Sequence, residues 1–173
     1  AIAFVEGQEG YVFRTNYVAD ITHNVVSYAR KLSASDFAGF HLFYLDSGPM
    51  DVTNREYPDG TGAKFNVQSI AFRTTHGRRL TARLKVGVSL NFIRDDIHTV
   101  AMNTMAFDIG SNFDTGIYGF ILGMSVTNFG PEVQYYGDGL QQIVPDTIDV
   151  DGVLHKVTEP FPLPLVFRLG IEN

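Results

Sequence analysis

The sequence predicts an all-β fold, an antiparallel up-and-down β-barrel that crosses a membrane. Three observations indicate it. Apolar and polar side chains alternate along several long segments, long and short links between these segments fall into a regular order, and charges gather with glycines on one side of the segments. We expect residues 1–173 to form a single β-barrel domain, since this length suffices for one domain with a core.

The composition narrows the class of protein further. The chain is 45% hydrophobic and 18% charged, which excludes disorder. It has no cysteine, so disulfides, cysteine zinc sites and thiol nucleophiles are excluded. A net charge of −6 argues against a nucleic-acid partner. The first ten residues lack the features of a signal peptide, and no apolar run approaches the ~20 residues of a transmembrane helix.

The strongest strand signal covers residues 80–94. One parity is apolar and the other is charged, polar or small, as expected when successive side chains point to opposite faces. At ~3.3 Å per residue this strand would reach roughly 50 Å, beyond the ~17–20 Å usual in soluble proteins. The same pattern alone also fits half of a soluble β-sandwich whose polar face lies in water. The apolar set is Leu80, Ala82, Leu84, Val86, Val88, Leu90 and Phe92.

The order of the links favours the barrel. Further strands are predicted at residues 17–32, 37–45, 65–75, 97–112, 118–129 and 165–172. The links at 33–36, 76–79, 95–96 and 114–116 are short, whereas those at 46–64 and 130–164 are long. In a meander, alternate links lie at the same end, so both long links are predicted at one rim. Outer-membrane barrels show this asymmetry.

Charges and glycines share one side of the predicted strands, while the opposing side is almost wholly apolar. A barrel interior can pair such charges, and glycine leaves space there for a plug or a loop. We therefore expect Arg83, Lys85, Asp108 and Arg168 to face the lumen, with Arg83 and Asp108 as a candidate ion pair or anchor for a carboxylate. Glu172 shares this side with Gly87, Gly110, Gly119, Gly123 and Gly170.

Several phrases of the sequence carry a family resemblance. They are TNYVADITHN (15–24), YPDGTGAKFNV (57–67), LTARLKVGVSLNFI (80–93), AFDIG (106–110), GMSVTNFGPEVQY (123–135) and LPLVFRLGI (163–171). In these phrases and their order the chain resembles the PorV/PorQ family of bacterial outer-membrane proteins, which is related in fold to FadL-type channels.

The resemblance implies a FadL-like antiparallel barrel in the bacterial outer membrane. It implies a non-enzymatic part in type IX secretion, with outer-membrane lipid, a secretion translocon and exported cargo proteins as partners. The glycine-rich N-terminal plug of the family and its C-terminal strands are missing. The chain is then a partial barrel segment of a longer protein, or a shortened relative in which roughly eight strands close a small barrel.

No catalytic constellation, cofactor motif or metal motif stands out. The five histidines lack zinc spacing, and Gly-x-Ser-x-Gly is absent. The best carboxylate cluster, Asp146, Asp149 and Asp151, is a weak calcium candidate because it lacks the terminal glutamate of an EF-hand. Three functions therefore remain open: a secretion or cell-surface attachment component acting through its long loops, a FadL-like channel for small hydrophobic molecules, and a soluble β-sandwich binding module.

Overall fold

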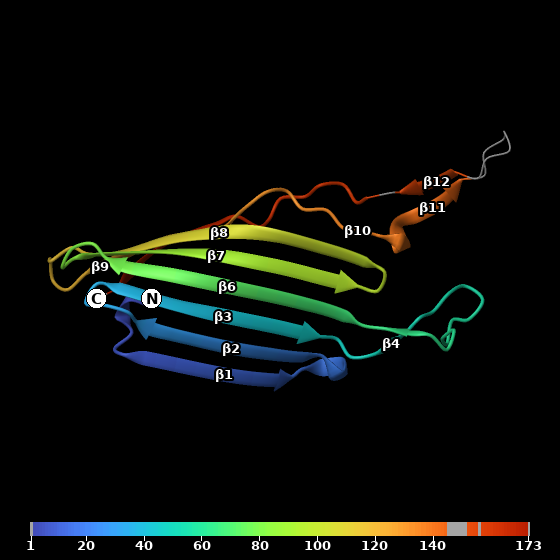
Figure 1. Ribbon diagram of the computed structural model, residues 1–173, viewed down its shortest axis with the longest axis horizontal. Helices are drawn as coiled ribbons and strands as arrows, with labels where there is room; N and C mark the ends of the chain where they lie inside the picture. The colour runs from blue at the N-terminus through green and yellow to red at the C-terminus, as the bar shows by residue number, and fades with distance from the viewer. Residues whose placement is uncertain (1, 145–151, 156, 173) are drawn as a thin grey trace.

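The computed structural model describes residues 2–144, 152–155 and 157–172 (Figure 1). Within them the regular structure is β apart from three short 3-10 helices, so the all-β prediction is confirmed. These helices are η1 (Ile2–Phe4), η2 (Val18–Asp20) and η3 (Asp138–Leu140). No helix in this part of the chain is long and apolar enough to cross a membrane.

One large antiparallel sheet dominates the molecule. Its main path runs β1-β2-β3-β6-β7-β8-β9-β13, and β10 adds to β8. Neighbours on this path follow one another along the chain, so the predicted up-and-down order is confirmed. The bounds are β1 Gln8–Asn16, β2 Thr22–Lys31, β3 Asp36–Asp46, β6 Val67–Arg79, β7 Leu84–Ile97, β8 Val100–Asp114, β9 Ile121–Phe129, β10 Tyr136–Gly137 and β13 Val166–Glu172.

The sheet is not closed into a barrel. The edge strands β1 and β13 each pair on one side only, β1 with β2 and β13 with β9. Closure requires the two edges to come within the ~4.8 Å spacing of paired strands, and here they stay apart. The prediction of a closed barrel is therefore not met by these residues, including the version in which eight strands close on themselves.

Both long links leave the sheet at the same end, as predicted. The link from β3 to β6 carries the ribbon β4 (Met50–Asp51) with β5 (Lys64–Phe65), and the link from β9 to β13 carries β11 (Gln141–Val144) with β12 (Gly152–His155). Figure 1 shows both on the right. The turns at 32–35, 80–83 and 115–120 lie at the opposite end, which we call the short-turn end.

Several strand boundaries differ from the prediction. Residues 76–79, predicted as a turn, finish β6, and the turn falls at 80–83. The Thr81 side chain fixes that turn, since its hydroxyl oxygen accepts a hydrogen bond from the Leu84 amide at 2.9 Å. The predicted link at 95–96 lies inside β7. Since the boundary moves without changing the alternation, the residues that remain in β7 keep their predicted faces.

Candidate functional site

The outer face of the sheet is apolar and exposed. On β7, the outer side chains Val88, Leu90 and Phe92 are 52%, 41% and 38% exposed. The neighbouring outer positions on β8 and β13 are equally open: Met105, Phe107, Ile109, Phe167, Leu169 and Ile171. A soluble sandwich would bury these rows against a second large sheet, but the described residues form only two small ribbons besides this sheet.

Polar residues border this apolar surface. At the end of the long loops the border runs through Arg14, Asn24, Asp46, Gln68 and Arg94, one from each of five neighbouring strands. The other border differs between the halves of the sheet. On β1 to β6 this border is polar and consists of Gln8, Arg30, Asp36, His76 and Arg78. On β7, β8, β9 and β13 the outer positions at the same end are apolar: Leu84, Phe113, Leu122 and Ile171.

The inner face carries a polar network centred on Arg73 of β6. Its Nε donates to Asn91 Oδ1 at 2.5 Å, and its Nη2 lies 3.3 Å from Asp108 Oδ2. Asp108 is only 7% exposed and also accepts the Asn128 amide at 2.9 Å. The buried carboxylate is thus held by a cation and a backbone amide, as a buried charge requires.

The predicted ion pair between Arg83 and Asp108 is wrong, because a different arginine pairs with Asp108. Arg83 lies in the turn before β7, where its guanidinium carbon would stand 2.7 Å from a Cβ at Gly116. Arg73 holds Asp108 instead. It was missed because the faces of the predicted strand at 65–75 alternate poorly; its signal is its pairing with Asn91 and His41 across neighbouring strands.

The other predicted lumen residues face inward. The Lys85 amino nitrogen lies 3.3 Å from the centroid of the Phe4 ring, a cation–π contact. Arg168 Nη1 lies 3.5 Å from Thr127 Oγ1. The calcium candidate, Asp146, Asp149 and Asp151, falls outside the described residues. Among the residues that are described, no three acidic, histidine or cysteine side chains group as metal ligands.

The N-terminal segment folds onto the inner face at the short-turn end. Ala3 and Val5 pack with the fully buried Phe37, and the Arg79 guanidinium donates to the Ala3 carbonyl at 3.1 Å. Space for the segment comes from glycine, since a Cβ at Gly77 would lie 2.5 Å from the Ile2 side chain. Gly39 also makes room for Ile2. The glycines that the sequence placed on the inner side, Gly87, Gly110, Gly123 and Gly170, do not contact the N-terminal segment, and Gly119 lies in a turn.

The base of the second long loop covers the inner face at the opposite end. A Cβ at Gly130 would lie 2.6 Å from the Met105 carbonyl oxygen, so the chain leaves β9 in close contact with β8. Val133 is 3% exposed and bridges to Phe161, whose ring stacks on Tyr135. The Tyr135 hydroxyl donates to Asp95; burial, and then this carboxylate, raises the pKa of Tyr135.

A trough of about 950 Å³ runs along the inner face. Its lining extends from Tyr11 on β1 to Arg168 on β13, so the sheet is curled enough for both edges to face one space. Ser27 and His41 form a hydroxyl–imidazole pair at 2.7 Å inside it. The neighbour of His41 on β6 is the cation Arg73, whereas nucleophilic catalysis needs a carboxylate or similar group to orient the imidazole. Among the described residues, the cross-strand neighbours of His41 are Ser27 and Arg73, and neither is a carboxylate.

The fold and its faces define a class: a curled antiparallel sheet with an exposed apolar outside, a polar inside and long loops at one end. The chain matches no protein-family model and no curated protein.

Proposed function

We propose that this chain forms the wall of a bacterial outer-membrane β-barrel of the PorV/PorQ type. The observation that carries the proposal is the outer face, where large apolar side chains stand exposed beyond a polar border at the end of the long loops, with a second polar border on β1 to β6. On β7 the apolar outer positions run from Leu84 to Phe92, about nine residues, and a tilted membrane strand needs ~9–11. Lipid hydrocarbon is the environment that suits such a surface.

A membrane location sets a condition on the edges. An unpaired backbone group in hydrocarbon costs several kcal/mol. In the bilayer the outer edges of β1 and β13 must therefore be hydrogen-bonded, either to each other or to further strands. The inner face suits a lumen, because its buried carboxylate Asp108 is already paired with Arg73.

The proposed role is non-enzymatic: a component of protein secretion or cell-surface attachment in the outer membrane. Its support is the placement of both long loops at one end, where they would form a single extracellular surface. The loops would contact a secretion translocon or exported cargo, while the barrel supplies the anchor in lipid.

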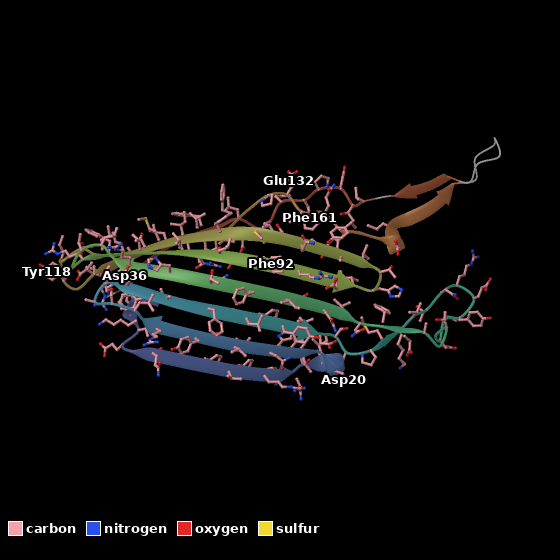
Figure 2. The ribbon with its side chains drawn as sticks, viewed as in Figure 1. Asp20, Asp36, Phe92, Tyr118, Glu132 and Phe161 are labelled. Carbon is pink, nitrogen blue, oxygen red and sulfur yellow. The ribbon has the colours of Figure 1, made fainter. Side chains whose placement is uncertain are left out.

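A photo-crosslinking amino acid tests this role. Tyr57 in the first long loop is 58% exposed, and Tyr118 in the β8–β9 turn is 88% exposed. Figure 2 shows Tyr118 at the short-turn end. In a secreting bacterium, crosslinker at position 57 should capture a large translocon barrel or a secreted protein, and crosslinker at 118 should not. Recovery of the chain from the aqueous phase without detergent, or equal capture from both positions, would contradict the proposal.

A second candidate is a FadL-like channel for small hydrophobic molecules, which the open trough favours. It predicts that a detergent or lipid molecule co-purifies inside the trough. A crosslinker at Tyr11, which lines the trough, would then label that molecule. If the purified chain carries no bound lipid or detergent in the trough, this candidate is removed.

A further inference from the structure

Two arginines and a histidine gather on the outer face at the short-turn end. The register places Arg30 of β2 and His76 of β6 on either side of Ala38 in β3. Arg78, two residues beyond His76, stands opposite Asp36. The side chain between them, Ala38, is small, and Arg30 and Arg78 lie roughly 12 Å apart at their Cα atoms. Two arginine side chains can reach a common anion across that span.

One carboxylate faces these three side chains. Asp36 Oδ1 lies 3.5 Å from His76 Nε2 and 3.6 Å from Arg78 Nε. Its Oδ2 accepts the hydroxyls of Ser33 and Ser35 at 2.8 and 2.9 Å, and these hydrogen bonds are the main cause of a lowered pKa of Asp36. No ion pair involves Arg30 within the described part of the chain. The cluster therefore carries surplus positive charge.

The opposite border is balanced differently. Arg94 donates from Nε and Nη2 to the two carboxylate oxygens of Asp96 at 2.7 and 2.8 Å. In this bidentate pair the charge of Arg94 is neutralised by Asp96. The short-turn border of β7 to β13 has no cation in line with Leu84 and Phe113. At the long-loop border Arg14 and Arg94 are matched by Asp46 and Asp96, so surplus positive charge at the edge of the apolar surface is a local property of β2, β3 and β6.

Apolar side chains continue directly from the cations. On β3 the outer positions after Ala38 are Phe40 and Leu42, and on β6 Phe72 follows Thr74. Phe40, Leu42 and Phe72 are 41%, 37% and 39% exposed. The surface is therefore amphipathic along the strand direction, with cations at one end and a strip of apolar side chains leading away from them. A phospholipid has the same order of groups, since its phosphate would meet the basic side chains and its acyl chains would lie along the apolar strip.

We propose that Arg30, His76 and Arg78 bind the phosphate of a phospholipid in the leaflet at the short-turn end. The acyl chains lie along Phe40, Leu42 and Phe72. Guanidinium groups suit this task because their planar forks match phosphate oxygens. The inference rests on the proposed membrane location and adds a specific lipid site to it.

Electron spin resonance of the full chain in phosphatidylcholine vesicles tests the site. The two probes are spin-labelled phosphatidylglycerol and spin-labelled diacylglycerol, which has the same chains and no phosphate. The chain should immobilise a larger fraction of the phosphatidylglycerol. In Arg30→Gln/Arg78→Gln this excess should fall to the diacylglycerol level, and Arg30→Lys/Arg78→Lys should retain part of it. The matched control Arg14→Gln/Arg94→Gln, at the other border, should keep the excess.

Each other outcome counts against the site. Equal immobilisation of both probes by the unaltered chain overturns it and leaves the membrane proposal standing, because lipid contact is still seen. An equal loss of the excess in the Arg14→Gln/Arg94→Gln control also overturns it, since general surface charge would then explain the effect. No immobilised fraction with either probe overturns both proposals. Far-ultraviolet circular dichroism of each variant establishes that the sheet is intact.

Discussion

The outer and inner faces of this sheet obey opposite rules although they are made by alternate residues of the same strands. On β7, Leu90 stands exposed without a partner, while its neighbour Asn91 is 4% exposed and bonded to Arg73. In water the usual arrangement is reversed, with apolar groups buried and polar groups at the surface. The exposed apolar row supports the proposed contact of the outer face with hydrocarbon, and the Arg73–Asn91 bond shows that polar groups of the inner face pair with one another.

A lysine at neighbouring positions gives the largest test of this comparison. Leu90→Lys places a charge at the middle of the outer face, where a bilayer should impose a cost of roughly 2–4 kcal/mol. Ser89→Lys, one residue away, points into the trough and should cost far less. Urea unfolding of both variants in lipid vesicles measures the difference. Equal stabilities would show that the outer face lies in water, where an exposed leucine is replaced at little cost.

The inner face is tested by removing its buried carboxylate. Asp108→Asn leaves Arg73 without its anion and weakens the acceptor of the Asn128 amide. The expected loss is about 1–3 kcal/mol, since Arg73 is 46% exposed and can recover hydration. Arg168→Gln on the same face is the control, and it should change the free energy of unfolding by less than about 0.5 kcal/mol. Equal effects would mean that the Arg73–Asp108 pair is not a centre of stability.

The two faces were predictable from the sequence because alternation along a strand survives errors in its ends. The β7 strand begins four residues later than predicted, at Leu84, yet Val88 and Lys85 keep their predicted sides. The turn was misplaced because the hydrogen bond from the Leu84 amide to Thr81 is local chemistry that periodicity does not register. Strand β1 escaped prediction because Tyr11 and Val12 make both of its faces partly apolar.

The contacts across the inner face were not predictable in the same way. Which cation holds Asp108 depends on the register of three strands, and parity alone admits both Arg73 and Arg83. The covering of the trough by Ile2 and by Val133 joins parts of the chain far apart in sequence. Such packing follows from the folded shape, so glycines that make room for it, such as Gly77, are found only once the structure is known.

The glycine on the inner face gives a smaller, local test. Gly77→Ala would push Ile2 away and should cost about 1–3 kcal/mol, the range for overpacking, with the lower end expected because the N-terminal segment can move. Gly87→Ala, on the paired strand, meets nothing closer than 3.6 Å and should be nearly neutral. Hydrogen exchange at Val5, whose amide donates to Ile2, reports the segment. Slow exchange in both variants would mean that glycine at 77 is not required for this packing.

The smallest expected effect marks where the apolar outer face ends. Hydrogen bonds from Ser33 and Ser35 lower the pKa of Asp36, so its ionised form stabilises the fold above the unfolded pKa of ~3.9 and this contribution disappears as pH falls through the lower folded pKa. Ser33→Ala should therefore reduce stability at neutral pH and converge with the unaltered chain in acid. Ser111→Ala, which leaves Asp36 untouched, is the control. A gap between Ser33→Ala and the unaltered chain that persists at pH 2 would mean that Asp36 is not the titrating group, and a gap that grows in acid would place Asp36 inside the hydrocarbon, where burial raises the pKa of a carboxyl.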